Sequence, residues 1–335
     1  MEYYKINIYI KLIPNNILKI LKVKKMIERE SIYASIIGGI VGDALGVPYE
    51  FTSQTKMKEN PATTMTGYGT YNQPVGSWSD DSSMTLATMD SLINGVDYDD
   101  MMTKFNQWIS EGKYTPRGEV FDYGNTTYNA LMEYPLYPPL ECGLTYERSN
   151  GNGSLMRIMP VIIYGNSKQF NVEEQMKLVD NVSSLTHAHP FSKASCNIYN
   201  IIVQEVLNNP KKNLQELINI GIDKSRKYYE NDEYPCFNKL YSPLFSKDES
   251  EISSSGYVVD SLEVALYSCY HTYSYKEAVL KSINYGGDTD TNAIITGGLA
   301  GLYYGYGEIP SDWIEQIIKI DYIQNLCEKF YQSLK

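Results

Sequence analysis

Apolar residues recur along most of the chain at intervals of three and four positions, the spacing that places them on one face of an α-helix. Alternation typical of a β-strand is weak, and the run 159–165 could instead end a helix. The pattern therefore predicts a mostly all-α domain with long functional loops. Helices are predicted over residues 29–46, 82–94, 99–111, 124–132, 173–185, 190–207, 211–229, 259–271, 274–285, 290–304 and 311–333.

The first predicted helix carries a stripe of glycines. Gly38, Gly42 and Gly46 stand four positions apart and form one smooth face. A glycine within a helix costs about 1 kcal/mol relative to alanine. Because three such costs occur together, we expect another helix or a ligand to approach this face closely. The predicted helix 290–304 is apolar nearly all round and is expected to be buried.

Two segments depart from the helical pattern. Residues 1–28 are basic and interrupt isoleucine and leucine with lysine, proline and asparagine, so we interpret them as a loosely ordered extension of a domain over residues 29–335. A membrane-surface or targeting helix is the alternative. Residues 231–256 are polar, with two prolines and three consecutive serines, and this composition predicts a surface insertion.

The composition narrows the class of protein. Of 335 residues, 43% are hydrophobic and 21% are charged, as in a globular protein with a buried core. The net charge of −11 argues against a general binder of nucleic acids or anionic membranes, because phosphate groups need a basic surface. The five cysteines are scattered, without CxxC pairs, which argues against a zinc site and favours a reducing, cytoplasmic compartment. A monomer is expected.

Two stretches, GSWSDDSSM at 76–84 and GGDTDT at 286–291, each place two carboxylates at the start of a predicted helix. One acid would suffice to cap a helix and to interact with its dipole, for about 1 kcal/mol. A solvated cap is the simplest interpretation of GSWSDDSSM alone, whereas GGDTDT alone fits a metal site as well as it fits a cap. An EF-hand loop starting at Asp288 is excluded, because Ala293 and Leu299 stand where it needs glycine and glutamate.

Taken together, the two stretches predict one site. If both helix starts converge, four carboxylates meet, and each pair about 4 Å apart repels by roughly 4 kcal/mol at an effective dielectric constant near 20. Such a cluster needs cations. Oxygen ligands without histidine or cysteine favour Mg²⁺, Mn²⁺ or Ca²⁺ over zinc. The four acids are Asp80, Asp81, Asp288 and Asp290.

Seven motifs, in order, resemble those of the ADP-ribosylglycohydrolase family, from about residue 31 to the C-terminus. The resemblance implies a compact, single-domain, all-α fold with a binuclear Mg²⁺ (or Mn²⁺) centre at helix N-termini. It also implies hydrolysis of the bond that joins ADP-ribose C1″ to an acceptor, so the partner would be an ADP-ribosylated protein or another ADP-ribose conjugate. The motifs are GGIVGDALGVPYE (38–50), GSWSDDSSM (76–84), FDYGNTT (121–127), NGNGSLMR (150–157), THAHP (186–190), SGYVVDSLEVAL (255–266) and GGDTDTNAIITGGLAG (286–301).

The resemblance also assigns roles to residues at the metals. Glu50 matches an acid near the second metal and the scissile bond, and Asp290 would bridge the two ions. Ser79 stands where the family usually has threonine; its hydroxyl can still ligate but lacks the β-methyl group that restricts χ1. The implied ligands are Ser79, Asp80 and Asp81 for one ion and Asp288, Asp290, Thr291 and Glu50 for the other, and the implied catalytic residues are Asp80, Asp81 and Glu50.

A second group of residues would hold the substrate. The loop NGNGSLMR contains small residues whose backbone N–H groups can surround a phosphate, although from the residues alone a plain tight turn fits as well. Arg157 could meet a phosphate or form a structural ion pair. The implied contacts are Asp122 and Gly124 at the distal ribose, Asn152, Gly153, Ser154, Met156 and His187 at the diphosphate, and Tyr257 at the adenine.

The resemblance therefore implies a metal-dependent hydrolase that reverses ADP-ribosylation. Asp80 or Asp81 would position the attacking water, and Glu50 would assist the leaving group. A non-catalytic, crystallin-like member of the family and a metal-dependent nucleotide phosphohydrolase are the alternatives. The acceptor linkage (arginine, serine, poly-ADP-ribose or a small-molecule ester) stays open, because the variable loops carry no readable code.

Overall fold

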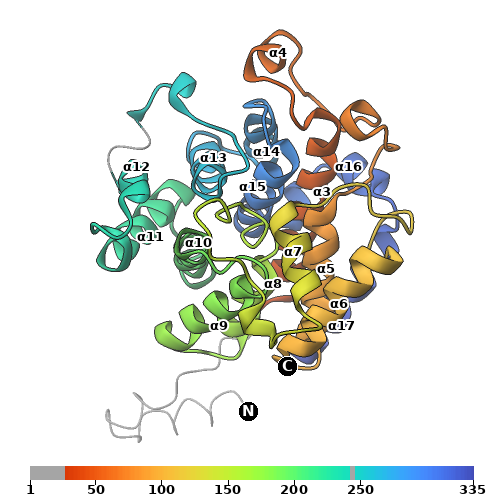
Figure 1. Ribbon diagram of the computed structural model, residues 1–335. Coiled ribbons are helices and arrows are strands. Elements are labelled where there is room, and N and C mark those ends of the chain that lie inside the picture. Colours follow the sequence, from red (N-terminus) through yellow and green to blue (C-terminus); the bar gives the residue numbers. More distant parts are fainter. Residues whose placement is uncertain (1–26, 242–245) are drawn as a thin grey trace, which may run out of the picture.

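The computed structural model describes residues 27–241 and 246–335, so nearly all of the predicted extension 1–28 lies outside the described residues (Figure 1). Within these ranges the chain forms helices joined by loops, with isolated β-bridges and no strand, which confirms the predicted all-α fold. The α-helices are α3 (Arg29–Gly46), α4 (Gln54–Glu59), α5 (Asp80–Leu92), α6 (Tyr98–Glu111), α7 (Asn125–Glu133), α8 (Met159–Ser167), α9 (Val172–Ser184), α10 (Pro190–Asn208), α11 (Leu214–Tyr229), α12 (Asn238–Tyr241), α13 (Val258–Tyr270), α14 (Tyr275–Ile283), α15 (Thr289–Tyr304), α16 (Ser311–Gln316) and α17 (Ile320–Ser333).

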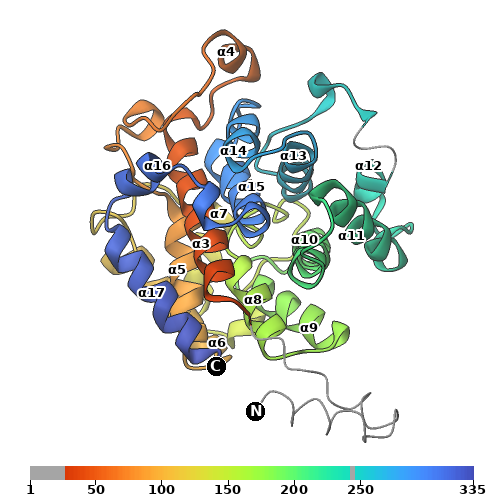
Figure 2. The same cartoon turned by 180° about the vertical axis from the view of Figure 1, so that it is seen from behind.

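Helices α3 and α15 lie side by side at the centre, and the other long helices surround them (Figures 1 and 2). Their glycines allow this approach. A Cβ atom added at Gly42 would lie 2.2 Å from the Ala293 carbonyl oxygen, and one at Gly38 would lie 2.7 Å from the Gly297 carbonyl oxygen. The glycine stripe therefore serves helix–helix packing, one of the two uses expected for it.

Helix α3 and the turn after it are long and apolar enough to cross a membrane by length and composition alone. However, 89% of the apolar window is buried inside the domain. Tyr275 donates a hydrogen bond to the Gly38 carbonyl oxygen (2.6 Å), and Tyr199 donates one to the Ile295 carbonyl oxygen (2.9 Å). The surrounding helices thus account for the apolar composition of this pair.

Several element boundaries differ from the predicted ones, and three of the differences have a clear local cause. Helix α5 begins at Asp80 rather than at residue 82, with Ser79 as its N-cap. The run 159–165 is the body of α8, which begins a helix instead of ending one; Pro160 fits because a proline in the first turn needs no N–H bond. The predicted helix 311–333 is divided into α16 and α17, because Lys319 adopts a left-handed backbone conformation (φ 55°) between them.

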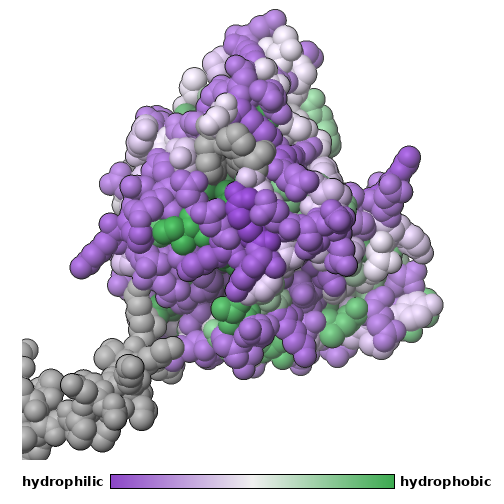
Figure 3. Space-filling model, turned by 90° about the vertical axis from the view of Figure 1, so that its left-hand side faces the viewer, coloured by the Kyte–Doolittle hydropathy of each residue, from purple (hydrophilic) through white to green (hydrophobic). Residues whose placement is uncertain are grey.

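The described part of segment 231–256 lies outside α13 (Figure 1). Lys239 forms ion pairs with Asp260 (2.6 Å) and Glu263 (2.7 Å) of that helix, and Lys247 pairs with Glu263 (2.5 Å). Phe237, a residue of the segment itself, is fully buried. The face that carries α11 and α12 is largely hydrophilic, with scattered apolar residues (Figure 3). The segment is therefore attached to α13 by charges as well as by packing.

Candidate metal centre

The starts of α5 and α15 meet at the C-terminal end of α3. The Thr289 hydroxyl donates to the Gly46 carbonyl oxygen (2.8 Å). A Cβ atom at Gly46 would lie 2.5 Å from both the nitrogen and the Cα of Asp290. Two acidic stretches that are about 200 residues apart in the sequence are thus brought against the same end of one helix.

Carboxylate oxygens gather there in two groups. Those of Asp43, Asp81 and Asp290 lie within 4.8 Å of one another, and so do those of Glu50, Asp122 and Asp290. Asp290 belongs to both groups, as a ligand shared by two ions would. The two helix starts therefore converge as the sequence required, with Asp81 and Asp290 in these groups and Asp80 and Asp288 in neither. Asp122, expected at the distal ribose, is itself a member of the second group.

Hydroxyl groups hold Asp81 in this arrangement. Ser79 donates to Asp81 Oδ2 (3.0 Å), and Thr291 donates to Asp81 Oδ1 (3.1 Å). In the backbone, the N–H of Asp81 donates to Ser79 Oγ (3.3 Å), which is the N-cap bond of α5. The three residues come from both helix starts, so Asp81 joins α5 to α15.

Sequence reasoning missed Asp43, a fully buried residue of α3. Its carboxylate accepts bonds from the backbone N–H of Ser79 (3.0 Å) and from the backbone N–H (3.0 Å) and the hydroxyl of Ser82. Burial raises the pKa of Asp43 to about 6, although these hydrogen bonds act in the opposite direction. The available signal was an isolated acid within an apolar, glycine-striped helix.

Asp288 is held by a residue that was expected to bind substrate. Asn152 Nδ2 donates to Asp288 Oδ2 (2.9 Å) and to Ser261 Oγ (2.8 Å). Asp288 Oδ1 is buried without a hydrogen-bond partner. The side chain of Asn152 therefore orients an acid of the cluster, and its predicted diphosphate contact would need its backbone N–H, which already donates to the Gly256 carbonyl oxygen (3.2 Å).

The cluster is electrostatically unfavourable without cations. Burial and the charges of neighbouring acids raise the pKa values of Asp80, Asp81 and Asp290 well above their ordinary range, and they raise that of Glu50 to about 8. Among the described residues, no lysine or arginine forms an ion pair with these acids.

The unpartnered oxygens of the cluster test whether metal ions fit. Glu50 Oε2 and Asp290 Oδ2 are buried with no hydrogen-bond partner, like Asp288 Oδ1. A buried anionic oxygen without a donor is costly, and a cation removes that cost. Because the donor set consists of carboxylates and hydroxyls alone, it suits a hard divalent ion such as Mg²⁺ or Mn²⁺.

Tyr71, in the loop between α4 and α5, is a second residue that sequence reasoning missed. Its hydroxyl bonds to both Glu50 and Asp122. Its ring continues a row of aromatic side chains along the rim of the site, with centroids 6.5 Å from Phe51 and 5.2 Å from Phe121. In a chain with 31 tyrosines, nothing in the sequence singles it out.

Tyr71→Phe is expected to lower the turnover of the hydrolysis that the sequence predicts about tenfold, because the variant loses one hydrogen bond to a charged group and keeps the ring. Steady-state kinetics would measure this loss. Tyr68→Phe is the matched control, because Tyr68 is 63% exposed and should leave turnover unchanged. Equal kinetics in both variants would show that the Tyr71 hydroxyl does not orient Glu50 or Asp122.

The remaining predicted substrate residues divide into two sets. Gly124 is an exposed N-cap of α7, and Tyr257 is a half-buried N-cap of α13 that pairs with Gly151, so both are accessible to solvent. Ser154 is fully buried, and its hydroxyl accepts a bond from Ser183 (2.9 Å). The Ser154 hydroxyl is thus occupied within the protein, and the diphosphate contact expected of Ser154 stays a prediction.

Met156 is also buried, at 5% exposure, and the Thr85 hydroxyl bonds to its carbonyl oxygen (3.4 Å). The contact with the diphosphate that the resemblance implies for Met156 stays a prediction. Gly153 lies against the ring of His187, since a Cβ atom at Gly153 would lie 2.7 Å from His187 Cε1. The His187 ring therefore packs directly against the loop at Gly153.

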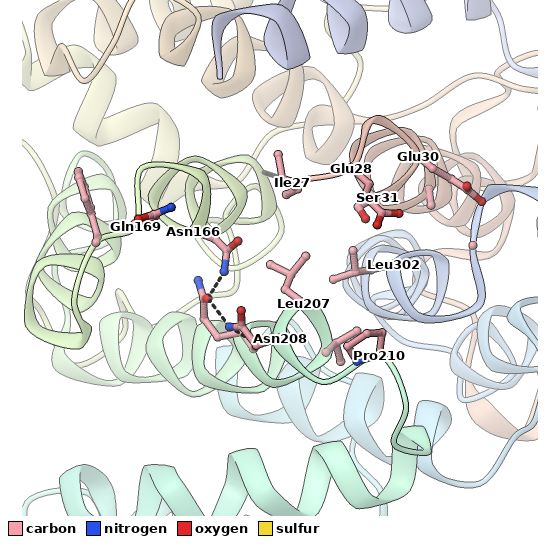
Figure 4. Close-up of a pocket in the computed structure, with 15 residues that line it drawn as sticks. Ile27, Glu28, Glu30, Ser31, Asn166, Gln169, Leu207, Asn208, Pro210 and Leu302 are labelled. Atoms are coloured by element: carbon pink, nitrogen blue, oxygen red, sulfur yellow. Dashed lines mark hydrogen bonds between the residues drawn. The ribbon is translucent and has the colours of Figure 1, made fainter. Parts of the chain in front are cut away.

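A cavity of about 570 Å³ lies elsewhere, at the opposite ends of α3 and α15 (Figure 4). Ile27, Leu207 and Leu302 line it together with polar side chains, among which Asn166 donates to Gln204 (2.6 Å). It contains none of the clustered acids. The volume of this cavity is therefore unrelated to the acidic site.

Comparisons with known proteins show which family the chain resembles. The sequence model of the ADP-ribosylglycohydrolase family matches residues 25–335. ADP-ribosylarginine hydrolase Tri1 of Serratia proteamaculans (strain 568) is 29% identical over 306 residues, which cover 89% of this chain and 78% of that protein. ADP-ribosyl-[dinitrogen reductase] glycohydrolase of Rhodospirillum rubrum is 26% identical, with 84% and 88% covered.

Two further comparisons are with more distant proteins. ADP-ribosylhydrolase ARH3 of Mus musculus is 24% identical, with 89% of this chain and 87% of that protein covered. A solved structure, described as an ADP-ribosylglycohydrolase-related protein complex, shares the fold with a TM-score of 0.77 at 24% identity, covering 92% of this chain and 99% of that one. With its family model matched over nearly its whole length and its acids assembled at two helix starts, the chain belongs to the ADP-ribosylglycohydrolase family.

Proposed function

We propose that this protein hydrolyses the glycosidic bond between C1″ of ADP-ribose and an acceptor, in an ADP-ribosylated protein or a related conjugate. Membership of the family supports a hydrolase of ADP-ribose conjugates. The observation that carries the proposal is the group of buried carboxylates around Asp290, which no lysine or arginine of the described residues neutralises. The arrangement is costly in a merely structural protein and useful in a metal-dependent hydrolase.

Two Mg²⁺ ions, or Mn²⁺ in their place, are proposed to neutralise the cluster. When bound, such ions act as Lewis acids toward the oxygens they contact and hold a substrate in register with the protein. The residues that would hold them are Ser79, Asp80, Asp81, Asp288, Asp290, Thr291 and Glu50. The structure adds Asp43 behind this set, where its bonds to Ser79 and Ser82 fix the first turn of α5.

The carboxylates of the protein are proposed to have separate roles in the hydrolysis. Glycoside hydrolysis commonly uses one carboxyl group at the leaving group and another at the attacking water. Glu50, held by the Tyr71 hydroxyl at the rim, is proposed to assist the leaving group. Asp80 is half-buried beside Asp122 and is proposed to position the water, whereas Asp81 is bound by two hydroxyls.

Removal of metal is expected to silence the enzyme. After treatment with EDTA, release of ADP-ribose should stop and the melting temperature should fall, because the acids repel one another without cations. Either Mg²⁺ or Mn²⁺ should restore both quantities. Full turnover in the absence of divalent ions would contradict the proposed site.

The products separate the proposal from its rivals. Chromatography should show intact ADP-ribose; AMP or phosphate would indicate a nucleotide phosphohydrolase instead. Binding of ADP-ribose without turnover of any substrate would indicate a non-catalytic member. Arginine-linked, serine-linked and polymeric substrates, assayed in parallel with Mg²⁺, would identify the acceptor.

The cellular setting is proposed from the cysteines and the charge. All five cysteines are free, and Cys236 is the one that is not buried, which supports a reducing, cytoplasmic location. The net charge of −11 supports a partner other than nucleic acid. We propose a monomer as the working state, which size-exclusion chromatography with light scattering would test.

A further inference from the structure

Arg157 is a fully buried arginine without a carboxylate partner among the described residues. Its Nη2 donates to Thr186 Oγ1 (2.7 Å), its Nη1 donates to the Val182 carbonyl oxygen (3.3 Å), and its Nε has no partner. The guanidinium also lies 4.8 Å from the ring centroid of Phe105. Neither of the roles left open by the sequence, phosphate partner or ion pair, fits this position.

The hydrogen bonds continue from Arg157 to a histidine. A guanidinium can only donate, so Thr186 Oγ1 is the acceptor of the Arg157 bond. Thr186 Oγ1 also lies 2.8 Å from His187 Nδ1. Among the described residues, Nδ1 is the one group to which the Thr186 hydroxyl can give its single proton. His187 Nδ1 is therefore the acceptor, and the ring proton belongs on Nε2.

The opposite edge of the His187 ring faces the Gly-rich loop. A Cβ atom at Gly151 would lie 3.7 Å from His187 Nε2, and one at Gly153 would lie 3.1 Å from it. His187 is only 3% exposed, and no described residue accepts a bond from Nε2. The loop is joined to the segment that carries Tyr257, because Val258 N–H donates to the Asn150 carbonyl oxygen (3.1 Å).

We propose that Arg157 is a positioning residue that acts through Thr186 to hold His187 as the neutral Nε2–H tautomer, with that N–H directed at a phosphate oxygen bound along the Gly151–Gly153 loop. The identification of this phosphate with the diphosphate of ADP-ribose rests on the proposed function. Burial and the nearby Arg157 charge lower the pKa of His187 to about 3, which agrees with a neutral ring at physiological pH.

A purely structural role of Arg157 makes a different prediction. Its bond to the Val182 carbonyl places a positive charge near the C-terminal end of α9, where it interacts favourably with the helix dipole. If this were its entire role, removing Arg157 would lower stability and leave the His187 tautomer unchanged. The tautomer is therefore the quantity that distinguishes the two roles.

Nitrogen-15 NMR of the imidazole groups would test the relay in the full-length protein. The chain has three histidines, so His187→Gln assigns the relevant signals. In the unmodified protein we expect a neutral Nε2–H ring from pH 5 to pH 8. Thr186→Val keeps the side-chain shape but removes the relay, so signals should shift toward a mixture of tautomers, and Thr186→Ser should restore them.

The same variants predict a separation of kinetic constants. One hydrogen bond to a charged ligand group corresponds to about tenfold in affinity. Thr186→Val and Arg157→Met should therefore raise the Kd for ADP-ribose and the KM about tenfold, and they should lower kcat by less than about threefold. Arg157→Lys should recover part of the affinity. Thr186→Val keeps the test decisive if Arg157→Met does not fold.

An unchanged tautomer in Thr186→Val would overturn the relay, whatever happens to the melting temperature. A tautomer change with unchanged Kd for ADP-ribose, in a protein that binds it, would overturn the proposed ligand contact. A tautomer change in a protein that neither binds nor releases ADP-ribose would support the relay and contradict the proposed function. The two proposals can therefore fail separately.

Discussion

Asp290→Asn is expected to abolish release of ADP-ribose while the helical fold persists. Asp290 contributes oxygens to both acidic groups, each within 4.8 Å, and one of these oxygens has no hydrogen-bond partner. An amide supplies one neutral oxygen in place of a charged pair, so neither proposed ion would keep its shared ligand. We expect a fall in turnover of at least about 100-fold. Asp81→Asn should have a similar effect, because Asp81 joins both helix starts.

The same substitution should have the opposite effect on the metal-free protein. Burial and the charges of Glu50 and Asp81 raise the pKa of Asp290 well above its ordinary range. A raised pKa means that the protonated carboxyl stabilises the fold below the unfolded pKa of about 3.9, and that this contribution is lost as pH rises through the folded value. At neutral pH in EDTA, Asp290→Asn should therefore melt a few degrees higher than the unmodified protein.

Calorimetry with and without Mg²⁺ measures the effect of Asp290→Asn on the stability of both the metal-bound and the metal-free protein. The unmodified protein should gain stability from Mg²⁺, whereas Asp290→Asn should gain little. Asp232→Asn is the matched control, because Asp232 is exposed and the substitution makes the same change in net charge. If Asp290→Asn kept its turnover, or lost stability equally in EDTA and in Mg²⁺, the residue would be structural and the metal centre would lie elsewhere.

Local sequence patterns predicted the elements well where one period controlled a long segment. The glycine stripe of α3 identified a close approach because few other reasons exist for three helical glycines four apart. The division between α16 and α17 was missed, because Lys319 carries no signal for its left-handed conformation. That conformation depends on tertiary contacts, which the periodic spacing of apolar residues along a helix does not reveal.

The site was predictable where residues of one kind stood side by side. Asp80, Asp81 and Asp290 occur in paired acids, and those pairs carried the inference. Asp43 was not predicted because its partner Ser79 lies 36 positions away. A single buried acid also produces no periodic pattern in the sequence. Arg157 was left between two roles because its partner Thr186 is 29 positions away, so the direction of its donors depends on the packing of α9 against the loop.

Gly46→Ala tests whether the packing of α3 against α15 places the site. Gly46 has ordinary helical backbone angles (φ −79°, ψ −37°), so alanine brings no backbone strain and should even gain about 1 kcal/mol of helix propensity. Its Cβ atom, however, would lie 2.5 Å from Asp290 N and Cα and 2.6 Å from the Thr289 carbonyl carbon. These are backbone atoms at the start of α15, and they cannot move aside as a flexible side chain can.

The start of α15 must therefore shift, at a cost of about 1–3 kcal/mol. A displacement of about 1 Å at a catalytic group can lower the rate about 100-fold, so Gly46→Ala should lose both melting temperature and turnover. Gly307→Ala is the matched control, because no atom lies within 4 Å of its added Cβ. If Gly46→Ala kept the turnover and the Mg²⁺ response of the unmodified protein, contact with α3 would not fix Asp290. The hydroxyl bonds of Ser79 and Thr291 to Asp81 would then be what holds the two helix starts together.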